Sequence, residues 1–436
     1  MQLGVYIKER ILGSSFVKDS MWSFMGNVLG RGLALLASIF IARLLGKDLF
    51  GMYGFVRSTL LTMAIFSSFG LGYTATKFVA EYLSKSPERI RSLIDDINRI
   101  TLVAGTFCAV LIFLFSAEIA RLLGEPELYG AIRYLAVIVV FNSVTTTQIG
   151  VLAGFKRYKQ LARINVINGV VTFFISVVLT YFYSLNGALL ALLITQVFNC
   201  LQNYIAVRRS IDALGVVCER CSISSVLLRF STPIAMQEIV YSLSGWILTF
   251  LMVRLYDVGE VGISNAAAVW SSFILFIPGT LRNVILSYLS SDSDDPKRQV
   301  RTTNHMLLIN LLATTIPFIV VWLLSDLIQL MYGASYTRLA SVLILSIFAT
   351  IPSCLSSVLA QYFIALNKNW LSLWIRIVRE CVAIACFVLF YYIYPSIPGA
   401  ISLAMTTVLV HILGFVTYYL FFLYQRPNGT ERIESV

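Results

Sequence analysis

Charged residues are scarce in this chain. Of its 436 residues, 13% are charged and 58% are apolar, whereas a soluble globular protein carries about 25% charged residues. The mean hydropathy is +0.82, and no soluble fold of this length buries that much apolar surface. The composition therefore excludes a soluble enzyme, a nucleic-acid-binding protein and a disordered chain, and it indicates a polytopic membrane protein.

Residues for metal or nucleotide chemistry are also few. The chain has two histidines, His305 and His411, and it lacks the G-x-x-x-x-G-K-[ST] pattern of a phosphate-binding loop. Its seven cysteines are odd in number, and Cys218 and Cys221 form a lone C-x-x-C pair. A structural zinc site needs about four ligands. We therefore expect free thiols, no metal site and no cofactor.

Long apolar runs divide the chain into about twelve predicted membrane spans, since a helix needs about 20 apolar residues to cross a bilayer. The predicted fold class is an all-α polytopic membrane protein with two pseudo-symmetric six-helix bundles. The spans lie near 21–43, 53–76, 100–117, 132–154, 164–184, 187–206, 231–253, 263–289, 305–325, 339–363, 371–394 and 399–423.

The basic residues are distributed unevenly about these spans. Of the 33 Lys and Arg residues, 25 fall in the segments on the same side as the N-terminus and 6 on the opposite side. Because cytoplasmic loops carry an excess of Lys and Arg, both termini are predicted to be cytoplasmic. The net charge of +11 is then explained by orientation signals that face anionic lipid, without nucleic acid.

The two halves of the chain form an apparent repeat. The Arg43-Leu44 pair and Gly51 match the Arg254-Leu255 pair and Gly262 at an offset of 211 residues. We therefore predict an N-terminal bundle at 21–206 and a C-terminal bundle at 231–423. The segment 207–230 links them, with cytoplasmic ends at 1–20 and 424–436. Parallel repeats favour alternating access; the alternative is general similarity between hydrophobic helices.

Three ionisable residues are predicted to lie deep within spans, where a charge costs at least about 2.5–3.5 kcal/mol on insertion scales. They are Arg31, Arg57 and Glu238, and Glu238 is the one acid among them. Arg376, Arg379 and Glu380, near the start of the predicted span 371–394, are instead assigned to the cytoplasmic side with the segment 364–380. We expect Arg31 and Arg57 to line a central cavity, although a pair between Arg31 and Glu238 is an open alternative. Further candidates for the polar lining are Asn27, Asn142, Gln196, Asn199 and Gln361.

Two arginines against one acid make the predicted cavity net basic, which suits an anion. Guanidinium groups match phosphate well through paired hydrogen bonds. For the amide residues, hydrogen bonding between helices is the simpler alternative to cavity lining, and it is worth about 0.6 kcal/mol per contact. The residues alone thus indicate a two-bundle transporter with an anionic substrate that can carry phosphate.

Several motifs resemble those of a known transporter family. They are Asn-Val-Leu-Gly-Arg-Gly at 27–32, Ala-Arg-Leu-Leu-Gly-Lys-Asp-Leu-Phe-Gly at 42–51, Gly-Val-Leu-Ala-Gly-Phe-Lys-Arg-Tyr at 150–158 and Leu-Met-Tyr-Gly-Ala-Ser-Tyr at 330–336. The chain resembles the polysaccharide-export and O-antigen flippases, which share a superfamily with the multidrug and toxin extruders. The resemblance covers essentially the whole chain.

This resemblance implies a multidrug-extruder-like fold in a bacterial inner membrane. It implies that an undecaprenyl-pyrophosphate-linked oligosaccharide moves from the cytoplasmic to the periplasmic leaflet, for O-antigen, capsule or exopolysaccharide synthesis. It also implies membrane lipid and polysaccharide polymerase or export machinery as partners. Some members use an ion gradient, so Glu238 is our candidate for H⁺ or Na⁺ coupling.

Two other functions stay open. A multidrug antiporter of the same superfamily exports cations and is expected to have an acidic cavity. A polyprenyl-glycan polymerase or ligase needs a carboxylate or histidine cluster on a sizeable outer loop. Here the predicted outer loops are short and their acids are scattered, so we expect a transporter and not an enzyme.

Overall fold

A computed structural model describes residues 15–122, 126, 129–214, 224–276, 278–279, 296–366 and 368–424. Within these residues all the regular secondary structure is helical, with no strand. Eight helical stretches of the described chain are long and apolar enough to cross a membrane. The chain is therefore an all-α multi-pass membrane protein. The C-x-x-C pair at Cys218 and Cys221 lies outside the described residues, and the five described cysteines are free.

Long helices are the structure that these apolar runs require. Hydrocarbon offers no hydrogen-bond partner to the backbone, so each crossing segment must satisfy its own N–H and C=O groups. Two of the helices each contain two predicted spans. The helix α2 (Ser15–Ser68) breaks at Gly46, with φ 72°, and α8 (Tyr158–Asp212) breaks at Ser184, with φ 48°.

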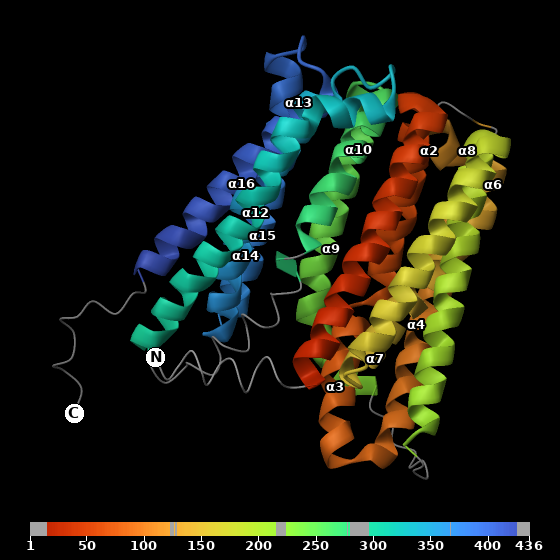
Figure 1. The fold of residues 1–436 in the computed structure, drawn as a ribbon, viewed down its shortest axis with the longest axis vertical. Coiled ribbons are helices and arrows are strands. Elements are labelled where there is room, and N and C mark those ends of the chain that lie inside the picture. Colours follow the sequence, from red (N-terminus) through yellow and green to blue (C-terminus); the bar gives the residue numbers. More distant parts are fainter. Residues whose placement is uncertain are drawn as a thin grey trace. The chain divides into compact units, whose positions relative to one another are not determined.

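The described chain forms two compact units, of which unit 1 comprises Met1–Leu45 and Tyr53–Ser242. Apart from α2, α8 and the start of α9, its helices are α3 (Leu71–Lys85), η1 (Pro87–Arg89), α4 (Ile90–Leu114), α5 (Ser116–Leu122), α6 (Tyr129–Leu135) and α7 (Val137–Gly154). The helix α7 packs against α3, α4 and α8 (Figure 1). A core that includes Leu71, Leu93, Ile97 and Leu152 holds them together.

Unit 2 comprises Gly46–Met52 and Leu243–Val436. Its helices are the larger part of α9 (Ser224–Leu255), α10 (Val258–Ile274), α12 (Pro296–Tyr332), α13 (Leu339–Phe348), α14 (Thr350–Ala365), α15 (Asn369–Ile393) and α16 (Gly399–Tyr424). The helix α16 packs against α13, α14 and α15. Aromatic residues dominate one core cluster, including Tyr362, Phe363, Tyr418 and Phe422. The short segment 46–52 thus groups with a unit whose other residues come from the second half of the chain.

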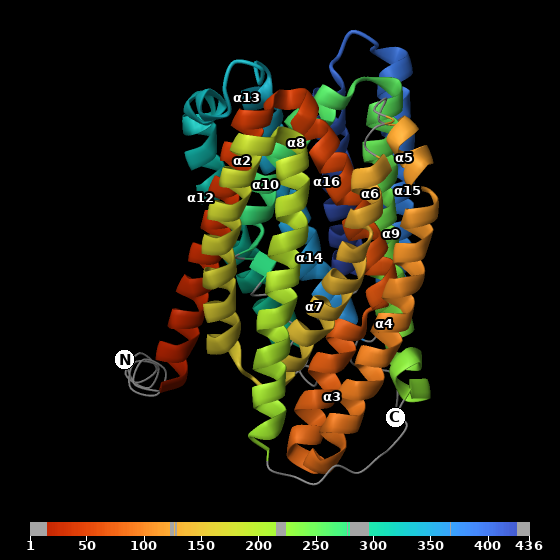
Figure 2. The ribbon, with the colours of Figure 1, turned by 90° about the vertical axis from the view of Figure 1, so that its right-hand side faces the viewer.

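In unit 1, small residues let α2 approach the first arm of α8 closely. A Cβ atom added at Gly26 would lie 3.1 Å from the Cβ of Ala162, and one added at Gly30 would overlap the carbonyl oxygen of Asn165. Helices in membranes associate through such packing, because lipid provides no hydrophobic drive between them. The two arms of α8 run beside each other (Figure 2), and Asn168 on one arm is hydrogen-bonded to Asn199 on the other.

The close contact at Gly30 predicts a large effect of adding a side chain there. Gly30→Leu forces α2 away from the α8 backbone, and overpacking of this kind costs at least about 1–3 kcal/mol. We expect a lower Tm of the purified protein in a thermal-shift measurement. Gly130→Leu is the matched control, since a Cβ at Gly130 meets no atom within 4 Å. Equal Tm values for both variants would contradict the close packing of α2 on α8.

Candidate functional site

The structure divides the predicted site residues between the two units. Seven of them belong to unit 1, and Gln361, on α14, belongs to unit 2. Those of unit 1 are Asn27, Arg31 and Arg57 on α2, Asn142 on α7, Gln196 and Asn199 on α8, and Glu238 on α9.

The two arginines of α2 lie at the surface of unit 1. The side chains of Arg31 and Arg57 are both exposed, although they belong to a stretch that is apolar enough to span a membrane. Arg31 directly follows Gly30, whose face of the helix packs against α8.

The amide residues of unit 1 are joined to one another by hydrogen bonds. Asn165 donates to Asn27 over 2.5 Å, and Gln196 donates to Thr145 over 3.2 Å. Asn199 is hydrogen-bonded to Asn168. These bonds connect α2, α7 and the two arms of α8, which is the helix-joining role that the sequence left open for such residues. An amide group has further donors and acceptors, so a bond of this kind does not exclude cavity lining.

Three further candidates differ in their surroundings. The Glu238 side chain is half-buried. Asn142 is half-buried on α7. Gln361 is 2% exposed, and its Nε2 has no hydrogen-bond partner among the described residues. Gln361 thus lies inside unit 2.

Sequence reasoning missed a cluster of ionisable residues in unit 2. Arg379 Nη2 lies 2.5 Å from Glu380 Oε1, and these side chains are 14% and 12% exposed. Ser244 of α9 donates a hydrogen bond of 2.8 Å to the other oxygen of the same carboxylate. Both oxygens of Glu380 therefore have a partner.

The position of this cluster corrects two expectations. Arg376 and Arg379 were assigned to a cytoplasmic loop, but they lie on α15, which begins at Asn369. Glu238 is not the one acid in mid-span, because Glu380 contacts Ser244, which lies well inside the predicted span 231–253. The reason is that counting Lys and Arg placed the whole of 364–380 on the cytoplasmic side, although the predicted span 371–394 already included this cluster.

His411 belongs to the same region of unit 2. The charges of Arg379, Glu380 and Arg376 all act on its imidazole. Its Nδ1 lies 2.7 Å from the carbonyl oxygen of Thr407. Since a carbonyl can only accept, Nδ1 is the donor. No group of three or more His, Cys, Asp or Glu side chains suited to a metal ion occurs among the described residues.

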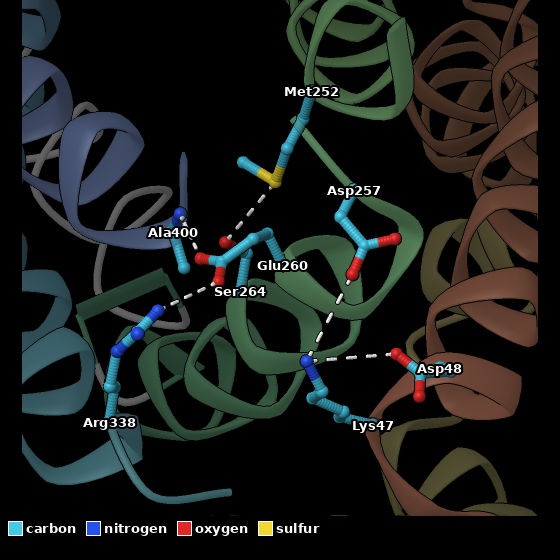
Figure 3. A network of polar contacts seen from close by, with 8 residues as sticks. All are labelled: Lys47, Asp48, Met252, Asp257, Glu260, Ser264, Arg338 and Ala400. Atoms are coloured by element: carbon cyan, nitrogen blue, oxygen red, sulfur yellow. Dashed lines mark hydrogen bonds and ion pairs between the residues drawn. The ribbon is translucent and has the colours of Figure 1, made fainter. Parts of the chain in front are cut away.

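A second polar network of unit 2 lies where three of its helices begin (Figure 3). Glu260, in the first turn of α10, accepts a hydrogen bond of 2.8 Å from the backbone N–H of Ala400, at the start of α16. Its other oxygen lies 3.4 Å from Arg338 Nη1, and Arg338 precedes α13. A carboxylate at the N-termini of two helices is favoured by their dipoles. Glu260 thus ties α10 to α13 and α16.

Lys47, in the segment 46–52, makes separate ion pairs beside this network. The Nζ atom of Lys47 lies 3.8 Å from Asp48 Oδ1 and 4.0 Å from Asp257 Oδ2 (Figure 3). Tyr336, which is fully buried, interacts electrostatically with Asp48. Burial is the main cause that raises the pKa of the Tyr336 hydroxyl, and the Asp48 carboxylate raises it further. This hydroxyl therefore stays protonated over the physiological range.

Comparison with known proteins places these features in a family context. A family model described as "Polysaccharide biosynthesis protein" matches residues 40–341. An EPS I polysaccharide export inner membrane protein of Ralstonia solanacearum is 22% identical over 296 residues, which are 66% of this chain and 66% of that relative.

Solved structures share the fold. A lipid II flippase in an inward closed conformation has a TM-score of 0.73 and 18% identity, over 94% of this chain and 88% of that one. An inward-facing multidrug resistance transporter of the MATE family has a TM-score of 0.71 and 13% identity, over 91% and 95% of the two chains. At these identities the likeness establishes the fold alone.

The buried ion pair of unit 2 predicts that replacing one partner lowers stability more than replacing both. Arg379→Met leaves the carboxylate of Glu380 buried without its cation, which typically costs about 3–5 kcal/mol. We expect a markedly lower Tm for this variant and recovery in the double variant Arg379→Met/Glu380→Gln. As a control, Lys85→Ala breaks the exposed pair with Glu81 and is expected to leave the Tm unchanged. A single variant as stable as the wild type would contradict the pairing.

Proposed function

Because the chain belongs to the polysaccharide biosynthesis protein family, we propose that it is a flippase for a polyprenyl-pyrophosphate-linked oligosaccharide. In this proposal the oligosaccharide repeat unit moves from the cytoplasmic to the outer leaflet of an inner membrane. It then serves the synthesis of O-antigen, capsule or exopolysaccharide. The export protein of Ralstonia solanacearum supports the proposal by its described role and location, and the lipid II flippase supports it by its fold.

The observation that carries the proposal is the pair of exposed arginines on α2. A guanidinium group in an apolar helix is costly, so two of them at the surface of one unit indicate a use beyond packing. Each can form paired hydrogen bonds with a phosphate. We propose that Arg31 and Arg57 hold the pyrophosphate or acidic sugars, and that Asn27, Asn142, Gln196, Asn199 and Gln361 supply polar groups around them.

The proposed mechanism is alternating access without a chemical step. The polyprenyl tail stays in the lipid while the charged head group enters the basic cavity, since the transfer of a bare pyrophosphate through hydrocarbon is prohibitive. The protein contributes by exchanging the hydration of the anion for arginine contacts.

We propose Glu238 as the residue that couples transport to H⁺ or Na⁺. It is half-buried on α9, in a span where an unneeded acid is unfavourable. With both termini cytoplasmic, as the Lys and Arg distribution predicts, the polysaccharide polymerase or export machinery would receive the product at the outer face.

A multidrug antiporter is the second candidate, and the fold of the MATE transporter favours it. A cavity for cationic drugs is expected to present acidic groups. The exposed charges on α2 are arginines instead, which favours an anionic substrate.

The test uses a strain that lacks this protein and is complemented with variants. Arg31→Ala is expected to lose surface polysaccharide and accumulate the lipid-linked oligosaccharide in the cytoplasmic leaflet, although the protein reaches the membrane at normal levels. Arg31→Lys keeps the charge but loses the paired hydrogen bonds, so partial export is expected. Arg121→Ala, an exposed arginine of α5, is the matched control.

Other outcomes separate the alternatives. Normal export by Arg31→Ala would remove the anion-binding role of this residue. Normal surface glycan in the deleted strain, with raised sensitivity to cationic drugs, would favour the antiporter. Accumulation of the carrier on the outer leaflet would indicate a polymerase or ligase.

A further inference from the structure

Arg133 of unit 1 is held in position by three side chains. Its Nε atom donates a hydrogen bond of 3.2 Å to Ser116 Oγ. Its Cζ atom lies 4.9 Å from the ring centroid of Phe113 and 5.3 Å from that of Tyr129, and at such distances a cation is attracted to an aromatic ring. The Arg133 side chain is nevertheless exposed. Its guanidinium group is therefore oriented in advance at the surface of the protein.

The three contacts come from the region where α4, α5 and α6 meet (Figure 2). Phe113 lies near the end of α4, Ser116 begins α5, and Tyr129 lies one turn before Arg133 on α6. Residues four apart on a helix share a face, which explains the contact between Tyr129 and Arg133. Ile132 is 2% exposed, so α6 is anchored by its buried side while Arg133 lies on its exposed side.

The Ser116 hydroxyl leaves the outer edge of the guanidinium unused. Ser116 is fully buried, and its hydroxyl donates a hydrogen bond of 2.9 Å to the carbonyl oxygen of Phe113. A hydroxyl donates only once, so toward Arg133 the Ser116 oxygen acts as the acceptor for Nε–H. The N–H donors of the two Nη atoms of Arg133 remain for another acceptor.

Neither an ion pair nor membrane orientation explains this arginine. In the described part of the chain, no carboxylate forms an ion pair with Arg133, and Glu125 and Glu127 lie outside that part. Arg133 is one of the 6 basic residues on the predicted outer side. Orientation depends on Lys and Arg at the cytoplasmic side, so an arginine here works against the predicted topology.

The residues that flank Arg133 and Phe113 are apolar and exposed. They are Leu114 and Phe115 at the end of α4, and Tyr134 and Val137 after Arg133. In a membrane protein such side chains contact lipid, and aromatic residues are enriched where the bilayer meets water. An anion that reaches Arg133 at this level carries apolar chains of its own.

We propose that Arg133 binds the phosphate of a membrane lipid at the predicted outer end of unit 1. The Nη edge of a guanidinium group matches two phosphate oxygens, and Phe113 and Tyr129 hold it in position before the lipid arrives. A phospholipid and a polyprenyl pyrophosphate offer the same chemistry to this edge. The inference does not depend on the proposed flippase function, because binding requires no transport.

Native mass spectrometry of the purified full-length protein tests the proposal. Phosphatidylglycerol and undecaprenyl pyrophosphate are titrated separately, and undecaprenol is the probe without phosphate. We expect Arg133→Gln to weaken the binding of a phosphate lipid about tenfold or more, because hydrogen bonds to a charged group are lost. Undecaprenol binding should not change. Arg121→Gln is the matched control, since Arg121 is an exposed arginine in the last turn of the neighbouring α5.

Two further sets of variants separate this site from others. Phe113→Leu and Tyr129→Leu keep the charge of Arg133 but remove an aromatic face, so a weakening of about twofold to fivefold is expected. The effect of Arg133→Gln should persist in an Arg31→Ala/Arg57→Ala background, which lacks the arginines of the proposed transport site. A failure of the proposed function therefore leaves this result intact.

The choice of lipid identifies the source of the phosphate. A loss with both phosphate lipids indicates a general lipid-phosphate site, and a loss with one of them assigns the site to that lipid. Equal affinities of Arg133→Gln and Arg121→Gln for both phosphate lipids would overturn the proposal. An equal loss with undecaprenol would also overturn it, because apolar contacts and not the phosphate would then explain the binding.

Discussion

The structure depends on the inability of hydrocarbon to form hydrogen bonds. Every backbone group that enters the membrane must be satisfied by its own segment, which leaves long helices as the available form. Breaks are confined to a few positions, and the two in the longest helices fall at Gly46 and Ser184. The same constraint means that each polar side chain within a membrane helix needs a hydrogen-bond or ion-pair partner.

The polar side chains of the two units have different kinds of partner. In unit 1 the amides bond to one another, as between Asn165 and Asn27. In unit 2 a carboxylate is satisfied on both oxygens, since Glu380 receives Arg379 and Ser244. The arginines Arg31 and Arg57 differ from Arg379, because their side chains are exposed while that of Arg379 is largely covered. This contrast supports a substrate role for the former and a structural role for the latter.

Helices approach one another closely mainly where a glycine, which has no side chain, lies at the contact. Gly30 meets the backbone of α8, and Gly51 and Gly262 meet the backbone of the opposite repeat. Without a hydrophobic drive between helices, contact area at short range is the main source of attraction. Exposed ion pairs accompany such a contact at Lys47. The contact there is specific in its geometry, but the ion pairs add little to its stability. This combination suits a transporter that must pass through more than one state.

The sequence by itself determined the membrane class, most of the helices and the family. Apolar runs predict spans because transfer into lipid depends mainly on composition over about 20 residues. The repeat offset of 211 also identified Gly51 and Gly262 as equivalent positions. It failed at the start of α15, which begins at Asn369, because Arg376 and Arg379 were counted with a cytoplasmic segment.

Tertiary structure alone decided which residues meet. The sequence held no signal that the segment 46–52 belongs with unit 2, or that Glu380 lies beside Ser244 at a separation of 136 residues. It also left open whether Asn27 faces a cavity or Asn165. The physical reason is that the bilayer fixes how each segment crosses it, whereas neighbours are fixed by side-chain shape and pairing between segments far apart in the chain.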